Sequence, residues 1–129
     1  MTEPNADARL PGMTVQHTFL LEELLAQLIG TLDIDPATNC LVVRVQVSRL
    51  DDKLGIVPAE HLVDVAWPLG STIAIRDNKP ALLDATGQTI AHVGDEVSVG
   101  GGSVPTTTAN VVPCTGQDHV FVGHHPRRL

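Results

Sequence analysis

Hydrophobic and polar residues alternate along much of the chain with a period of two, the spacing of a β-strand that has one buried face. The clearest run covers residues 41–48, where Arg44 and Gln46 occupy polar positions. Its alternating apolar positions are Leu41, Val43, Val45 and Val47. We expect a half-buried strand here, followed by a loop over 51–55 and by the segment IVPAEHL over 56–62, to which no element is assigned.

Shorter runs follow at 63–67, 71–76, 81–84, 88–93, 96–99 and 119–123. The stretches between them contain Asp, Asn and Gly, which are typical of tight turns. This spacing is typical of a barrel or a sandwich, and we predict a mainly β fold: a small antiparallel β-barrel of OB-like or similar topology. The expected core residues are Val43, Val45, Val65, Trp67, Ile73, Ile75, Val97, Val120 and Val122.

One segment has the period of a helix. In residues 18–30, TFLLEELLAQLIG, Thr18 could cap the N-terminus and Gly30 could end the helix. The leucines expected to pack it on the barrel are Leu21, Leu24, Leu25 and Leu28. A strand from about Ala26 competes, because Leu28, Gly30, Leu32 and Ile34 also alternate with their neighbours. We predict a short N-terminal helix that gives way to a strand at about Leu28.

The length of 129 residues fits one domain. Residues 1–17 contain two prolines and lack periodicity, so we expect a flexible N-terminal arm. Residues 18–125 then form the single β-barrel domain, and residues 126–129 form a tail.

Composition and charge exclude some functions. The formal net charge is −7, the basic residues are scattered, and the three aromatics supply few platforms for stacking bases, so we expect no nucleic-acid partner. No apolar run is long enough to span a membrane, and the first residues lack the pattern of a secretory signal.

Candidate metal ligands are few. Asp33 and Asp35 begin a calcium-loop pattern, but the sixth position is Thr38 and the twelfth is Arg44, so residues 35–39 are expected to be a turn. Zinc needs three or four converging ligands, and the only local concentration of histidines is His119, His124 and His125. These three are the candidate metal ligands, with an exposed chain end as the alternative, and no cofactor is predicted.

The glycine-rich stretch HVGDEVSVGGGSV, residues 92–104, is the candidate ligand-binding segment, with Gly94, Asp95, Gly100, Gly101 and Gly102 as its site residues. It lacks the Lys and the following helix of a phosphate-binding loop. The stretch is better explained by a hairpin turn at Gly94 and Asp95, with the glycine triplet letting the chain leave the barrel at a sharp angle. No nucleophile lies in a catalytic motif, so no catalytic residue is assigned.

Cys40 and Cys114 lie 74 positions apart. This spacing leaves two alternatives open: one disulfide, or two buried thiols in a cytosolic protein.

The order of several short motifs resembles a group of small bacterial proteins, mainly actinobacterial secreted or lipoprotein-like domains. The motifs are Cys40-Leu41, Trp67-Pro68-Leu69-Gly70, Leu83-Asp84-Ala85-Thr86-Gly87, the stretch Gly94–Gly102 and the late Cys114. The resemblance covers about residues 28–123 and implies a compact β-barrel in which Cys40 and Cys114 pair. It implies no activity. Members of this group are exported behind a leader, whereas this sequence starts with an acidic arm.

We therefore expect a non-enzymatic binding or interaction module, associated with the cell envelope, whose partner is an unknown protein or small molecule. One alternative is a metal-dependent or cysteine-based hydrolase that uses His119, His124 or His92 with Cys114 or Asp118. Another is a structural subunit that forms homo-oligomers through the leucine-rich helix. The chain as given suggests the cytoplasm, and an oxidised Cys40–Cys114 pair would place it outside.

Overall fold

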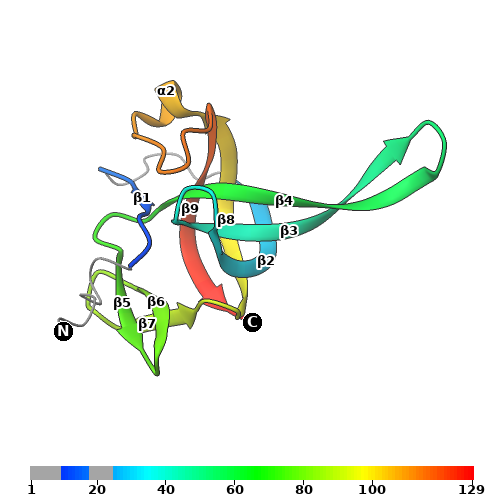
Figure 1. Cartoon of the computed structure of the whole chain (residues 1–129). Coiled ribbons are helices and arrows are strands. Elements are labelled where there is room, and N and C mark those ends of the chain that lie inside the picture. The colour runs from blue at the N-terminus through cyan, green and yellow to red at the C-terminus, as the bar shows by residue number, and fades with distance from the viewer. Residues whose placement is uncertain (1–9, 18–24) are drawn as a thin grey trace, which may run out of the picture.

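The structure is a computed structural model that describes residues 10–17 and 25–129 (Figure 1). Strands dominate it, as the sequence predicts. They are β1 (Thr14–Val15), β2 (Ala26–Asp35), β3 (Cys40–Asp51), β4 (Gly55–Trp67), β5 (Thr72–Arg76), β6 (Lys79–Leu83), β7 (Thr89–His92), β8 (Glu96–Pro105) and β9 (His119–Arg128). The short helix α2 spans Thr106–Ala109.

The larger sheet has the strand order β1-β4-β3-β2-β8-β9. Its pairs are antiparallel except for β1 with β4 and β9 with β4. Strand β9 pairs with β8 on one side and with Val65 and Ala66 of β4 on the other. The pairings therefore lead from β4 through β3, β2, β8 and β9 back to β4. Residues of β2, β3, β4, β8 and β9 contribute to one apolar core.

The smaller sheet, β5-β6-β7, is a meander between β4 and β8. Its first turn has Asp77 and Asn78 at positive φ, which short polar side chains tolerate. Leu82 and Ala91 of this sheet pack in the same cluster of buried residues as Trp67 and Val43. The two sheets therefore share one core.

Most of the expected core residues are buried. Val43, Val65, Trp67, Val97, Val120 and Val122 are inaccessible or nearly so, and Val45 and Ile73 are half-buried against them. The prediction for Ile75 is wrong, because this side chain is exposed. Ile75 pairs with Pro80 next to the β5–β6 turn, at the end of the hairpin, whereas Leu82 and Leu83 of β6 are buried.

The structure does not show the expected N-terminal helix. Leu21 and Leu24 lie outside the described residues, Leu25 is exposed, and β2 already begins at Ala26. Leu28 is half-buried against the core as part of this strand. The competing strand is thus confirmed, because its pairing with both β3 and β8 outweighs the local helical pattern.

Both chain ends differ from expectation where the structure describes them. Residues 10–17, which we call the strap, are held to the sheet: Gly12 N–H donates to Asn39 O (2.9 Å), Leu41 N–H donates to Gly12 O (2.8 Å), and β1 pairs with the end of β4. The expected tail at 126–129 is also paired, because β9 continues to Arg128 beside β8. Prolines and charged residues marked these ends as irregular, but backbone pairing fixes them.

The turn at 35–39 is confirmed. Asp35 accepts the backbone N–H of Ala37 (2.9 Å) and the hydroxyl of Thr38 (3.0 Å), and Asn39 has a positive φ of 55°. Residues 56–62, to which the sequence assigned no element, lie inside β4, and this strand pairs with β3 as far as Asp51 opposite Gly55. In Figure 1 these two strands run together far beyond the other elements.

Candidate functional site

The glycine-rich stretch is part of the sheet. Gly94 forms a turn with φ of 101°, and its N–H donates to Leu32 O (2.7 Å). The Asp95 carboxylate accepts the backbone N–H of His92 (2.9 Å). These contacts hold the turn against β2, so Gly94 and Asp95 serve the hairpin, as the second interpretation of the sequence expects.

The glycine triplet lies inside β8, between β2 and β9, and does not leave the sheet. At Gly101 a Cβ would lie 1.9 Å from Val122 O, and at Gly100 it would lie 2.9 Å from the His124 ring. Gly102 pairs with Val122. The expectation of a sharp exit is wrong: the triplet lets β8 and β9 approach closely at an irregularity between Ser98 and Gly100.

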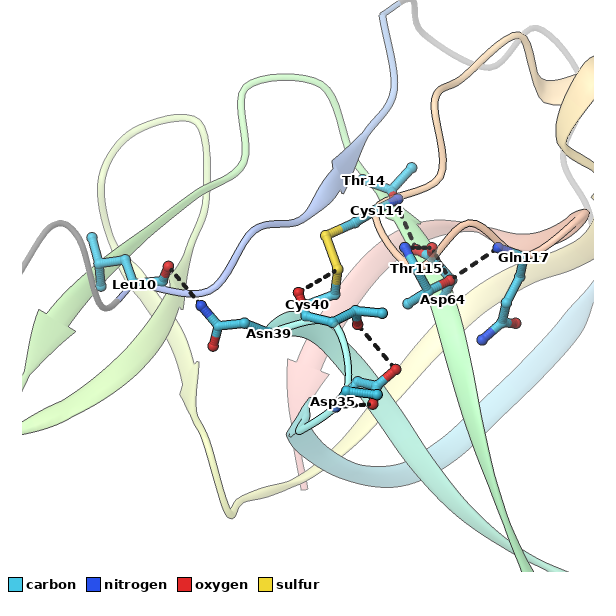
Figure 2. The surroundings of a disulfide bond; sticks show 11 residues. Leu10, Thr14, Asp35, Asn39, Cys40, Asp64, Cys114, Thr115 and Gln117 are labelled. Atoms are coloured by element: carbon cyan, nitrogen blue, oxygen red, sulfur yellow. Dashed lines mark hydrogen bonds between the residues drawn. A yellow bond between two sulfur atoms is a disulfide. The ribbon is translucent and has the colours of Figure 1, made fainter.

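The disulfide between Cys40 and Cys114 joins the start of β3 to residues 106–118, which we call the capping loop (Figure 2). The S–S distance is 2.07 Å and the Cα–Cα distance is 5.9 Å, within the usual range. A Cβ on Gly12 would lie 2.9 Å from Cys114 Sγ, so the strap passes directly over the bond. The Cys114 sulfur is therefore not a thiolate in this structure.

Beneath the strap lies a carboxylate that sequence reasoning missed. Asp64 has no exposed surface, and it accepts the Thr14 hydroxyl (2.7 Å), the Thr115 hydroxyl (2.7 Å) and the Thr115 N–H (3.0 Å) (Figure 2). Thr14 in turn accepts the N–H of Cys114 (2.8 Å). The network connects strap, sheet and capping loop, and its hydrogen bonds satisfy the buried carboxylate.

A second covered region continues from Asp64. Gln16 donates through its Nε2 to the carbonyls of Ala66 (2.8 Å) and Gly123 (2.6 Å). Ala66, Val120 and Val122 form a small buried cluster with half-buried residues of the capping loop, Ala109 and Val111, packed against it. At this end of the molecule both faces of β4 are thus covered; we call it the capped end.

The histidines do not converge. In the described part of the chain, no group of three or more His, Cys, Asp or Glu residues is placed to hold a metal ion. His119 contacts Asp118 on the surface (3.0 Å), and this hydrogen bond, with the charge of the ring, holds the pKa of the Asp118 carboxyl below its ordinary value. His124 and His125 contact each other edge to face.

His92 lies between two carboxylates. Its Nε2 is 3.1 Å from Asp77 and its Nδ1 is 3.7 Å from Asp95. This contact joins the β5–β6 turn to the β7–β8 turn, and the described structure shows no nucleophile bonded to this ring. The contacts of the His92 ring thus link the two turns to each other.

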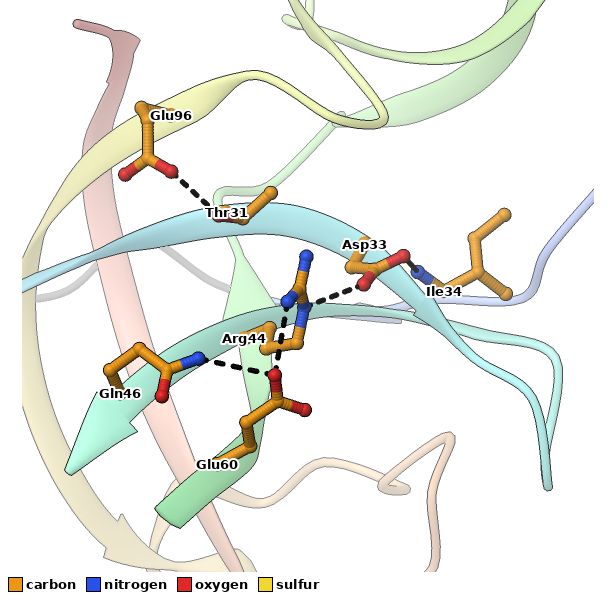
Figure 3. Close-up of polar contacts among 7 residues, drawn as sticks. All are labelled: Thr31, Asp33, Ile34, Arg44, Gln46, Glu60 and Glu96. Carbon is orange, nitrogen blue, oxygen red and sulfur yellow. Dashed lines mark hydrogen bonds and ion pairs between the residues drawn. The ribbon is translucent and has the colours of Figure 1, made fainter. Parts of the chain in front are cut away.

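A polar cluster lies where the β3–β4 hairpin leaves the sheet (Figure 3). Arg44 contacts Glu60 (3.2 Å) and Asp33 (2.9 Å), and Gln46 donates to Glu60 (3.1 Å). The hydrogen bonds to Glu60 and Asp33 raise the pKa of Arg44 above its ordinary value. The cluster marks the last level at which β2 also pairs with β3, Thr31 opposite Arg44.

Beyond this level, residues 45–61 form a two-stranded ribbon, which we call the arm (Figure 1). Among the described residues no third strand pairs with it. Its tip exposes Leu50 (77%), Leu54 (75%) and Ile56 (75%), and Leu50 is directly opposite Ile56. Clustered exposed aliphatic residues are typical of interaction surfaces. A sequence signal existed, since Leu54 interrupts the otherwise polar loop over 51–55 and Leu50 and Ile56 flank it.

Comparison with protein-family models, curated proteins and solved structures finds no match to this chain. In the described residues no helix has the length and apolar character needed to cross a bilayer.

Proposed function

We propose that this chain is a non-enzymatic interaction module: a small closed β-barrel that presents the arm to a partner. The pairing of β9 with both β8 and β4 supports a closed barrel, because it joins the two ends of the strand series β4-β3-β2-β8-β9. The shared core of both sheets supports a rigid scaffold from which the arm extends.

The contacts of the candidate catalytic groups support a non-enzymatic role. Cys114 is bonded to Cys40, and a cysteine-based hydrolase needs a thiolate. Asp64 is buried with its oxygens occupied by three donors, so it has a structural task. His92 is engaged with Asp77 and Asp95.

The observation that carries the proposal is the arm itself. A two-stranded ribbon is marginally stable alone in water, and exposed aliphatic side chains at its tip add nothing to its folding. Leu50 and Ile56 gain from burial only when another surface covers them. The arm is therefore the part of the described molecule best explained by contact with a partner.

The disulfide supports an oxidising compartment, because cytosolic reductants keep most thiols reduced. We propose that the module works outside the cytoplasm, at the cell envelope, consistent with the actinobacterial secreted domains that the sequence resembles.

Site-specific photo-crosslinking in the producing cells tests the function. A benzophenone side chain replaces Ile56 at the arm tip or, as a matched control, Ile75, an exposed isoleucine of β5. We expect one adduct of defined mass from position 56 and none from position 75. Adducts of equal yield from both positions, or none from position 56, would remove the arm as the contact surface.

A further inference from the structure

The two edges of the arm differ. On the β3 side, β2 pairs with β3 only from Thr31 onwards, and the preceding residues 26–30 of β2 pair with β8 only. The edge of β3 over 45–51 thus lies open among the described strands. On the β4 side, Pro58 stands opposite Ser48 and lacks an N–H, a feature typical of edges that resist strand addition. The β3 edge is therefore the one suited to accept another strand.

The open β3 edge is complementary to itself. If the β3 edges of two copies run antiparallel with Ser48 opposite Ser48, Gln46 of each copy lies opposite Leu50 of the other. The overlap of residues 45–51 spans roughly 20 Å at the usual rise per residue. It places the tip of each arm beside the root of the other.

That root offers an apolar surface to the arriving tip. Thr31 is opposite Arg44, and Ile29, two residues earlier in β2, lies on the same outward face of this strand, where β2 has already separated from β3. Ile29 is 52% exposed, and Leu25, just before β2, is 91% exposed. The Leu50 side chain of one copy would cover Ile29 of the other, and the same contact would repeat across the two-fold axis.

We propose that the partner of the arm is a second copy of this chain, and that two arms join along their β3 edges into a four-stranded antiparallel ribbon, β4-β3-β3-β4. This inference rests on the proposed function, in which the arm is the contact surface. A two-fold interface requires that one surface carry both halves of the contact, and here the tip and the root supply them. A different protein would need only the tip, and would leave the open β3 edge and Ile29 unexplained.

Sedimentation equilibrium of the oxidised full chain over a range of concentrations tests the inference. We expect a monomer–dimer equilibrium. The double variant Leu50→Glu/Ile56→Glu raises the dissociation constant about a hundredfold, because it places charges in an apolar contact. The control Ile75→Glu makes the same isoleucine-to-glutamate change at an exposed position away from the arm, and it leaves the dissociation constant unchanged.

Hydrogen exchange on the unmodified chain gives a second readout that needs no variant. Amides of residues 45–51 gain protection as the concentration rises, whereas amides of residues 56–61 do not. A protein that stays monomeric at every concentration, or a dimer indifferent to Leu50→Glu/Ile56→Glu with no added protection in β3, overturns the inference. If the chain is monomeric while the Ile56 crosslink yields an adduct with another protein, the inference fails and the proposed function stands.

Discussion

The two ends of the β3–β4 pair belong to one ladder but lie in opposite surroundings. At the capped end, Val43 faces the core, and Val42 and Asp64, on the other side of the strands, are also buried, Asp64 beneath the strap and the capping loop. At the arm end, Leu50 and Ile56 are exposed. An aspartate is thus buried and two aliphatic residues are not, the reverse of their individual preferences.

Along these strands, burial is decided by whether other segments cover a residue, and not by the polarity of that residue. Asp64 is tolerated because Thr14 and Thr115, from segments about 50 residues away in either direction, bring hydroxyl and amide donors to its oxygens. Leu50 has only its strand partner Ile56 opposite it and stays 77% exposed. Segments of the same chain cover the capped end, whereas the tip of the arm is exposed and, in the proposed function, is covered by a partner.

Removal of the disulfide should destabilise the capped end more than any other change considered for it. The variant Cys40→Ala/Cys114→Ala loses the cross-link between β3 and the capping loop, which closes a separation of 74 residues. We expect the free energy of unfolding to fall by about 4 kcal/mol, from the entropy of the unlinked unfolded chain. Urea unfolding of the oxidised protein and the variant measures it. An equal midpoint and slope for both would contradict a stabilising role.

Removal of the buried carboxylate tests the network beneath the strap. Asp64→Ala leaves the hydroxyls of Thr14 and Thr115 without their acceptor, and we expect a loss of about 3 kcal/mol. The control is Glu60→Ala at the arm root, an exposed carboxylate whose loss should cost at most about 1 kcal/mol. Similar losses in the free energy of unfolding for both variants would mean that the hydrogen bonds of Asp64 stabilise the protein no more than the exposed contacts of Glu60 do.

The same substitution at two places on β3 separates the ends directly. Val43→Ala removes buried core atoms, and we expect a cost of about 2 kcal/mol. Val47→Ala, four residues further on the same face, removes atoms that are partly exposed and should cost less than about 0.5 kcal/mol in the monomer. Thermal unfolding at low protein concentration gives both values. A cost at Val47 equal to that at Val43 would show that the arm is packed against the rest of the domain.

The sequence predicted the strands and core positions that follow from alternation along the chain, and it missed the contacts that segments distant in the sequence make. Alternation identified the strands and the core positions Val43, Val65 and Val97, because a period of two is a local property. The spacing of the two cysteines left a disulfide and two free thiols open, the resemblance implied the disulfide, and the structure contains it. The burial of Asp64 could not be read locally, since its donors come from the strap and the capping loop. The arm was not predicted, because Pro58 and the polar residues of the loop over 51–55 are more typical of a loop than of a strand.

The contact between Asp118 and His119 should make the stability of the protein slightly dependent on pH. His119, through its hydrogen bond and charge, holds the pKa of Asp118 below its ordinary value. The contact therefore contributes its full stability above the unfolded pKa and loses it as the pH falls through the lower, folded pKa. We expect wild type to lose slightly more stability on acidification than Asp118→Asn, while Asp52→Asn at the arm tip serves as a control for the removal of one surface charge. Thermal unfolding of the three proteins between neutral and acid pH checks this, and identical profiles for wild type and Asp118→Asn would show that the contact does not stabilise the capping loop.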